Sequence, residues 1–288
     1  MFKRVLLQSA AVFAVFALAT PAHAGMVDDA MSTFIELDGY VQQANKQNEA
    51  WEGDNAKESL EEAQDSADEY GQLMDAIHDA SDNLAGQLGD AWEQAMSDGA
   101  TLSAKITDTM GRIDGGSADF PGLLSAADTA ESSFNAAKQF TQQFKGKLFA
   151  FRAVTLNDMR ATFDNELKPN VEAAKTAMLA RNRNEAAAAI GRAKTAADKL
   201  VGQANDAKSM TVTLGDSVTE ATENLAPYFA AVQKDVQGLE AVLGSNPNNA
   251  ITTVSSSMAT ADKEITDSVN RMGGLESQFV LICDSNCR

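Results

Sequence analysis

A heptad pattern of small and apolar residues between residues 55 and 97 constrains the fold of this chain more than any other feature. Apolar residues recur there at alternating steps of four and three positions, and Ser81 is the single polar exception. The positions in this stripe are Ala56, Leu60, Ala63, Ala67, Tyr70, Met74, Ile77, Ser81, Leu84, Leu88, Ala91 and Ala95. Such spacing is typical of a helix that packs along a partner as in a coiled coil, and the many alanines favour a close approach. It predicts one long helix over 55–97.

Helical periodicity continues through most of the remaining chain. A second stripe runs from Leu123 to Phe151 and resumes at Leu156 with a shift of phase, which indicates a stutter or a rotated face, not a break. Pro169 is expected to begin a new helix, because proline is tolerated in a first helical turn. Turn-forming residues separate the segments. The predicted helices span residues 26–50, 55–97, 101–113, 121–167, 169–209, 212–243 and 248–280.

These patterns predict an all-α fold, an elongated bundle of long antiparallel helices with coiled-coil-like seams. Only 5 Pro and 19 Gly occur in 288 residues, which argues against an all-β sandwich with frequent turns. We expect one elongated domain over 25–288. It comprises acidic helices in 26–97, basic helices in 121–209 and C-terminal helices in 212–280 that end in a short disulfide tail.

The first 24 residues have the features of a secretion signal. Lys3 and Arg4 precede an apolar stretch, and small residues stand at Ala22 and Ala24 before Gly25. This arrangement predicts cleavage between Ala24 and Gly25, in a style typical of Gram-negative bacteria. An uncleaved anchor is the alternative, but the apolar run is short for a membrane span. The expected location is therefore periplasmic or extracellular.

Charge is distributed unevenly along the chain. The net charge is −18, and residues 26–100 hold 19 acids and two bases, whereas residues 138–199 hold twelve bases and six acids. Such an acidic chain repels nucleic-acid phosphates and anionic membranes, so nucleic-acid binding is excluded and membrane contact is not expected. We expect acidic and basic helices to flank one another. The alternative is that one of these segments is an exposed face for a partner of opposite charge.

The two cysteines, Cys283 and Cys287, lie close together at the C-terminus. In an exported chain such a pair predicts a disulfide. The closed loop is short, so we expect a local clip on the last helix, with little effect on overall stability. A redox or assembly role is the alternative. The apolar run Phe279–Ile282 before the pair indicates that the tail docks onto the body.

Catalytic and metal-binding patterns are absent from the sequence. After the predicted cleavage site the only histidine is His78, and carboxylates spread around one helix do not provide convergent ligands for it. Phosphate-loop, nucleophile-elbow, zinc-protease and haem-attachment motifs do not occur. The sequence predicts no enzyme activity, no cofactor and no metal site, and leaves weak calcium binding by acidic loops open.

Two apolar groups allow a ligand-binding interpretation beside a core one. Six phenylalanines at helical spacing are expected in the core, with a ligand pocket as the alternative. They are Phe134, Phe140, Phe144, Phe149, Phe151 and Phe163. The segment 225–232 contains Pro227 and is expected to form a buried kink, with contact to a partner or lipid as the alternative.

Together these features favour an exported, non-enzymatic helical protein of the bacterial cell envelope or secreted space. We expect it to bind protein partners, with self-association through its helical seams as one form of this. The alternatives are a helical pore-forming or membrane-active toxin component and a small-ligand-binding periplasmic bundle.

Overall fold

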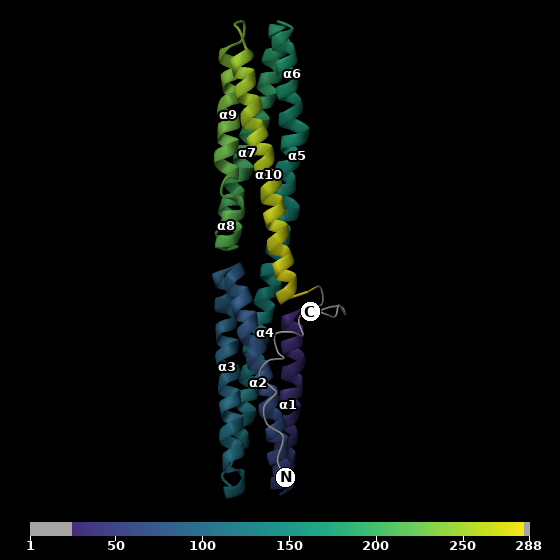
Figure 1. The fold of residues 1–288 in the computed structure, drawn as a ribbon, viewed down its shortest axis with the longest axis vertical. Helices are drawn as coiled ribbons and strands as arrows, with labels where there is room; N and C mark the ends of the chain where they lie inside the picture. The colour runs from purple at the N-terminus through teal and green to yellow at the C-terminus, as the bar shows by residue number, and fades with distance from the viewer. Residues whose placement is uncertain (1–24, 285–288) are drawn as a thin grey trace, which may run out of the picture.

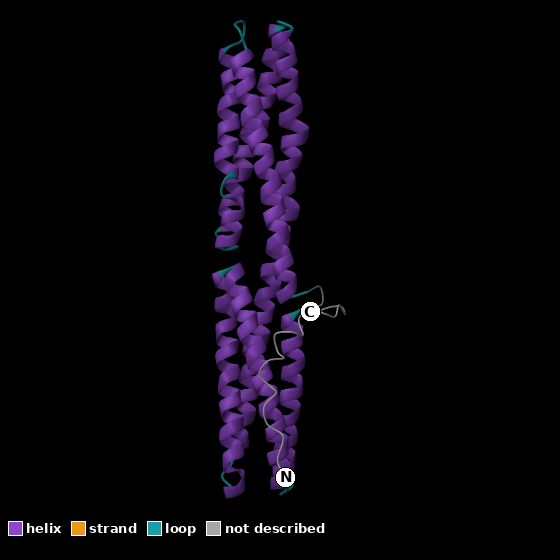
Figure 2. Cartoon of the chain, in the orientation of Figure 1, coloured by secondary structure: helices purple, strands orange, loops and turns teal. Residues whose placement is uncertain are grey.

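The protein is a rod of long helices, seen in a computed structural model that describes residues 25–284 (Figure 1). Helix accounts for about 90% of these residues, and they contain no strand (Figure 2). The all-α class predicted from periodicity is confirmed. Loops occupy the two far ends of the rod and its middle (Figure 2). This arrangement divides the rod into two four-helix bundles placed end to end.

The N-terminal bundle consists of α1 (Met26–Glu49), α2 (Gly53–Leu84), α3 (Gly86–Arg112) and α4 (Phe120–Ala150). Successive helices run in opposite directions, and each packs on the next (Figure 1). Their apolar stripes meet in the core, where Phe34, Tyr70, Trp92 and Phe134 form a chain of tilted and edge-on ring contacts. The ring centroids of Trp92 and Phe134 are 5.4 Å apart at 69°, an arrangement that aromatic pairs favour.

The helix boundary near residue 84 differs from the prediction. A single helix over 55–97 is wrong, because the chain reverses at Ala85, whose extended backbone (φ −162°, ψ 124°) separates α2 from α3. Gly89 allows the two helices to approach closely, since a Cβ there would lie 2.7 Å from Cβ of Asp82. Beyond the reversal Trp92, not the predicted Ala91, occupies the buried position. The predicted break near Asp98 is also wrong, because α3 continues to Arg112.

One continuous helix joins the two bundles. It begins with α4 and continues through π-helical η3 (Phe151–Leu156), α5 (Asn157–Thr162), π-helical η4 (Phe163–Leu167) and α6 (Lys168–Leu179). Phe151 and Leu156 are both fully buried although five positions separate them. A π-helical turn absorbs such a step, because its i→i+5 bonds enclose an extra residue. The predicted stutter is therefore confirmed, and η3 is its structural form.

The predicted boundary at Pro169 is wrong. The helix passes through Pro169 and ends at Leu179, and a short turn over 180–182 reverses the chain. Proline in a helix clashes with the preceding turn and lacks an N–H. The wide π-helical turn η4 lies directly before Pro169, and we attribute the uninterrupted path to this local widening.

The C-terminal bundle combines the upper part of this long helix with α7 (Arg183–Thr211), α8 (Asp216–Thr222), α9 (Leu225–Ala241) and α10 (Asn248–Ile282). α7 packs against α6 and α9, and α10 packs against α9 (Figure 1). Two buried glutamates lie on α10, and each faces an arginine: Glu264 pairs with Arg271, and Glu276 with Arg152 of η3. The turn order matches that of the N-terminal bundle, with the first and third turns at the far end and the second at the junction.

At the junction, the turns between α2 and α3 and between α7 and α8 face each other. The Gln87 side chain donates a hydrogen bond to the Thr213 carbonyl (2.7 Å). Gly215 has φ +92°, and a Cβ there would lie 2.7 Å from Cβ of Ala85. Only glycine satisfies both constraints without strain. The joint between the bundles is thus a close backbone contact.

The end of α10 meets the start of α1 on the other side of the junction. Gly25 is buried there, and a Cβ on it would lie 2.8 Å from the Asp284 backbone nitrogen. Lys145 of α4 donates hydrogen bonds to the carbonyls of Cys283 (3.0 Å) and Asp284. Ile282 and Cys283 are buried. The prediction that the tail docks onto the body is confirmed for these residues.

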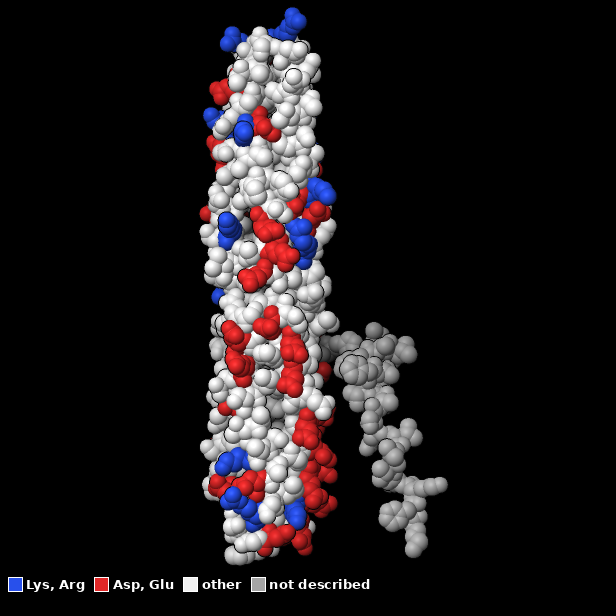
Figure 3. Space-filling view, turned by 60° about the vertical axis from the view of Figure 1, so that its left-hand side comes forward, with Lys and Arg blue, Asp and Glu red and all other residues white. Residues whose placement is uncertain are grey.

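The acidic and basic segments do not pair as predicted. The acidic helices α1 and α2 pack mainly on each other and on α3. Apart from Lys138 with Asp28 (4.0 Å), the ion pairs of the basic segment are with carboxylates between residues 158 and 276. Residues 25–150 therefore keep 24 acids against 7 bases, a net charge of −17, while residues 151–284 hold 17 acids and 13 bases, a net of −4. Acidic side chains are numerous on the N-terminal bundle, which is the lower half of the rod in Figure 3.

No helix within residues 25–284 combines the length and the apolar character that crossing a bilayer requires.

Candidate interaction surfaces at the two ends of the rod

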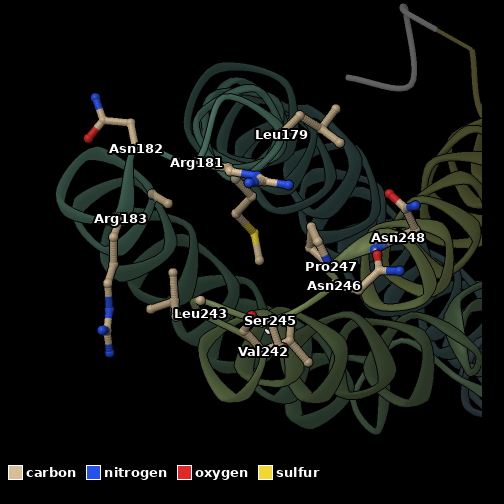
Figure 4. A pocket seen from close by; sticks show the side chains of 13 residues that line it. Leu179, Arg181, Asn182, Arg183, Val242, Leu243, Ser245, Asn246, Pro247 and Asn248 are labelled. Carbon is tan, nitrogen blue, oxygen red and sulfur yellow. Dashed lines mark hydrogen bonds between the residues drawn. The ribbon is translucent and has the colours of Figure 1, made fainter.

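A cavity of about 680 Å³ opens at the far end of the C-terminal bundle, and we refer to it as the distal cavity. It lies between the turn that joins α6 to α7 and the loop that joins α9 to α10 (Figure 4). Its lining residues are Met178, Leu179, Arg181, Asn182, Arg183, Ala186, Val242, Leu243, Gly244, Ser245, Asn246, Pro247 and Asn248. A volume of this size is typical of pockets that hold a small molecule or a large side chain.

The lining of the distal cavity combines apolar side chains with positively charged ones. Met178 and Ala186 are buried, Leu243 is half-buried and Leu179 is 62% exposed at the rim. In Figure 4 the side chain of Arg181 extends over the space enclosed by the helix ends, whereas Arg183 points away from it. An aromatic ring with a nearby negative charge is the kind of group that such a lining favours, since arginine stacks on aromatic faces and pairs with carboxylates.

Two asparagines of the cavity, Asn182 and Asn246, form local hydrogen bonds through their side chains. Asn182 caps α7 by accepting from the Glu185 backbone N–H (3.3 Å), and its amide donates to the Glu185 carboxylate (2.6 Å). The Asn246 side chain accepts from the Asn248 backbone N–H (3.1 Å). By contrast, neither cavity arginine forms an ion pair or hydrogen bond through its side chain within residues 25–284. The Arg181 guanidinium is therefore available to a ligand of the cavity, and the Arg183 guanidinium adds a positive charge beside it.

Trp51 stands at the opposite end of the rod, in the turn between α1 and α2. Its side chain is 96% exposed and its backbone is left-handed (φ +63°). The Trp51 N–H bonds to the Asn48 carbonyl (3.0 Å) and the Glu52 N–H to the Gln47 carbonyl (2.8 Å). These two bonds define a Schellman motif, a helix ending whose left-handed position usually holds glycine.

Arg181 occupies the same position in a second Schellman motif. The Arg181 N–H bonds to the Met178 carbonyl (3.1 Å) and the Asn182 N–H to the Ala177 carbonyl (2.8 Å), with φ +58° at Arg181. In residues 25–284, Trp51 and Arg181 are the two non-glycine residues with positive φ. A bulky residue in this conformation costs on the order of 1 kcal/mol or more relative to glycine. The same strained turn thus presents a tryptophan at one end of the rod and an arginine at the other.

Carboxylates surround the exposed tryptophan. Glu49, Glu52 and Asp54 are all exposed in the same turn. Lys57 does not neutralise them, because its ammonium pairs with Asp114 at 2.9 Å. The hydrogen bond with the Asp114 carboxylate and the charge of that group raise the pKa of Lys57 above its ordinary value. We refer to residues 49–54 as the Trp51 turn.

The predicted site residues lie away from both ends. Gly25 is at the junction, while Ala24 and Cys287 fall outside the described residues, so the cleavage site and the Cys283–Cys287 disulfide stay predictions. His78 lies on α2, where Nδ1 is 3.6 Å from the Asp79 carboxylate. Within residues 25–284, no group of three or more His, Cys, Asp or Glu side chains is placed to hold a metal ion.

The phenylalanines and the segment 225–232 belong mainly to the core. Four of the six phenylalanines (Phe134, Phe144, Phe151 and Phe163) are buried, Phe149 packs partly buried, and Phe140 is 37% exposed. Leu225, Phe229 and Val232 are also buried. Pro227 lies in the first turn of α9, and the helix is interrupted before it, between Thr222 and Leu225, not within the segment 225–232 as predicted.

Sequence patterns contain a weak signal for the distal cavity. Gly244–Asn248 is a loop with turn-forming residues and no charge, and Arg181 to Arg183 follows the last apolar position of α6. Nothing local indicates that these two segments, about 60 residues apart, meet at one end of the bundle. Comparison of the chain with protein-family models, with curated proteins and with solved structures gives no match.

Proposed function

We propose that this protein is an exported, non-enzymatic helical interaction protein of the bacterial cell envelope or secreted space, acting by binding protein. The observation that carries the proposal is the presentation of strained, exposed Trp51 and Arg181 at the two ends of the rod. Tryptophan and arginine are the residues most often found as binding hot spots. A Schellman ending requires a left-handed residue but not a bulky one, so tryptophan and arginine in place of glycine support a role in binding.

Export rests on the basic start, the apolar run and the Ala22–Ala24 site of the sequence. The predicted first mature residue, Gly25, lies directly before α1, so cleavage there would leave every described helix intact. Intact-mass measurement on protein recovered from periplasm or medium should give a chain that begins at Gly25. A membrane-bound chain that retains Met1 would contradict export by cleavage.

Photo-crosslinking tests the binding function. A photoreactive amino acid in place of Leu179, at the rim of the distal cavity, should form covalent adducts with protein in envelope extracts upon illumination. The same amino acid in place of Ile35, 60% exposed on the side of α1, is the matched control and should give few adducts. Equal labelling from both positions, or none from either, would contradict binding at the rod end.

A small-ligand-binding bundle is the second candidate, and the volume of the distal cavity favours it. A ligand held there would be apolar and anionic, to suit the leucines and arginines. Native mass spectrometry of protein purified under gentle conditions should then show a bound mass that the Arg181→Glu variant loses. An unliganded mass in both proteins would leave the protein-binding proposal as the better one.

The membrane-active alternative has a direct test. A pore-forming protein would have to expose about 20 apolar residues to lipid, and the excess of acids opposes approach to an anionic bilayer. We expect no dye release from liposomes at neutral pH. Rapid release that Phe229→Asp abolishes would favour the toxin component over the interaction protein.

A further inference from the structure

We propose that copies of this chain associate end to end, with Trp51 of one copy inserted into the distal cavity of the next. The inference rests on the proposed protein-binding function and names its partner as a second copy of the chain. The two surfaces lie at opposite ends of the same rod (Figure 1). Each copy therefore carries both halves of the contact.

The Trp51 turn has the properties of a ligand. Its indole is 96% exposed and held outward by the left-handed backbone of the Schellman motif. The other tryptophan of the chain, Trp92, is fully buried. Exposed large aromatic side chains are costly to leave in water, and burying one on association removes roughly 150–250 Å² from solvent. Burial of this fixed and exposed indole in a pocket that fits it would therefore stabilise the association strongly.

The distal cavity has the properties of the matching receptor. Its volume of about 680 Å³ is large enough for an indole together with part of its turn. Buried Met178 and half-buried Leu243 provide apolar surface for the ring. Arg181, which extends over this space (Figure 4), can lie against the ring face, and tryptophan is the best aromatic partner of a guanidinium.

The charges of the two surfaces are complementary. Glu49, Glu52 and Asp54 flank Trp51, whereas Arg181 and Arg183 flank the distal cavity and the adjoining loop 242–248 has no charged residue. Lysine or arginine side chains stand at that extreme end of the rod in Figure 3, whereas those near the opposite end lie among acidic side chains. Opposite charges at the rims steer encounter and favour one orientation over its reverse. Contact between the Trp51 ends of two rods would instead place the carboxylates of two Trp51 turns against each other.

The symmetry of such a contact predicts the kind of assembly. Two different surfaces on one copy make a heterologous contact, and at opposite ends of a rod it extends into an open chain instead of a closed ring. An end-on contact between two bundles is small, and interfaces below about 1,200 Å² are typical of weak, transient association. We therefore expect short chains that grow with protein concentration and shorten with added salt.

Sedimentation velocity on the purified chain 25–288 tests the proposal, since all described helices lie within it. The weight-average sedimentation coefficient should rise over a range from about 1 µM to about 1 mM. Trp51→Ala, which removes the ligand, and Arg181→Glu with Arg183→Glu, which reverses the receptor charge, should each lower the association constant by roughly tenfold or more. Ile35→Ala removes an apolar side chain that is 60% exposed on the side of the rod, and it should change nothing.

Mixing the two variants gives the sharpest outcome. The Trp51→Ala variant keeps an intact cavity, and the double arginine variant keeps an intact Trp51 turn. An equimolar mixture should therefore form one-to-one complexes that do not grow longer. A mixture that stays monomeric, or a wild-type chain that stays monomeric at about 1 mM, would overturn the proposal.

The failure of this inference is distinguishable from failure of the proposed function. If the purified chain stays monomeric while the Leu179 position crosslinks to a different envelope protein, the protein-binding function stands and the partner is not a second copy. If the wild-type chain associates and the Trp51→Ala variant associates equally strongly, self-association uses another surface, which would contradict the role of Trp51. Circular dichroism of each variant should match wild type, because all substituted positions are exposed.

Discussion

The two bundles of this rod share one topology but are held together by different interactions. The N-terminal bundle has α-helices over nearly its whole length and a core of alanines around an aromatic cluster, with Thr141 accepting a hydrogen bond from Trp92 (3.0 Å). The C-terminal bundle contains both π-helical segments and the break between α8 and α9. Its α10 carries buried Glu264 and Glu276, each paired with an arginine.

The difference shows two solutions to one packing problem. Where the stripe keeps a regular spacing, as in α2, small side chains let helices approach and aromatic rings fill the remaining space. Where the stripe shifts phase, as at Phe151–Leu156, the helix rotates its face through a π turn. Arg152 lies on this rotated stretch and Arg160 on α5 directly after it, and both pair with carboxylates of α10. Ion pairs there specify the position of α10, which an irregular apolar face would leave less defined.

The largest difference between the bundles should appear on removal of Trp92. Its side chain is fully buried, contacts Phe134 and donates to Thr141. Trp92→Ala should lower the free energy of unfolding by about 4 kcal/mol, through lost burial and the cavity that remains. Urea unfolding followed by circular dichroism measures the loss, and hydrogen exchange should place it in α1–α4. Trp51→Ala is the matched control and should leave stability unchanged; similar losses from both would mean that the cluster is not the core.

The C-terminal bundle should respond to loss of a buried ion pair. Arg271→Met leaves Glu264, 8% exposed, without its cation, and removes the hydrogen bond from Arg271 to the Ala221 carbonyl (3.0 Å). We expect a loss of about 2–3 kcal/mol, because an unpaired buried carboxylate is costly. Adding Glu264→Met should recover much of it in chemical denaturation. If the Arg271→Met, Glu264→Met double variant is no more stable than Arg271→Met alone, the unpaired charge of Glu264 is not the cause of the loss.

Two glycines, Gly99 and Gly71, test whether close approach of helices matters in the N-terminal bundle. At Gly99 a Cβ would lie 2.8 Å from Cε1 of Tyr70, so Gly99→Ala should cost about 1–2 kcal/mol by overpacking. At Gly71, a Cβ would meet nothing within 4 Å, so Gly71→Ala should stabilise the helix by up to about 1 kcal/mol. Thermal unfolding of both variants is the measurement. Opposite signs are expected, and the same sign for both would contradict the predicted contact at Gly99.

The smallest effect concerns the Tyr70 hydroxyl, which is buried without a hydrogen-bond partner among the described residues. Burial, and then the negative charge of Asp98, raise the pKa of Tyr70 well above its ordinary value. At neutral pH Tyr70→Phe should change stability by less than about 1 kcal/mol, because no bond is lost.

The same substitution should change the pH dependence of stability at high pH. Unfolded Tyr70 ionises near pH 10 whereas the folded residue keeps its proton, so stability falls as pH rises above about 10. The wild-type free energy of unfolding should decline there by up to about 1.4 kcal/mol per pH unit more steeply than that of Tyr70→Phe. Parallel profiles for the two proteins would contradict a protonated, buried Tyr70.

The position of the distal cavity illustrates why the candidate site could not be predicted. Its two halves, the Arg181 turn and the loop 242–248, each read as ordinary surface turns, and the helix boundary predicted at Pro169 would have placed Arg181 in the middle of a helix. Trp51 likewise read as part of a connection between helices. Their importance comes from left-handed backbone at non-glycine residues and from the contact of distant turns, and neither leaves a periodic signal in the sequence.

The sequence by itself determined the buried positions of α2, because burial of one helix face imposes a spacing that any apolar partner satisfies. Every stripe position from Ala56 to Leu84 is buried as predicted. Only the tertiary structure decided where the chain reverses. At Ala85 the stripe continues at the same spacing through the turn, since α2 and α3 present their apolar faces to one shared core. A regular seam is equally compatible with one long helix and with two antiparallel ones. The close approach of Gly89 to Asp82 across the turn, and of Gly215 from the other bundle to Ala85, selects the second.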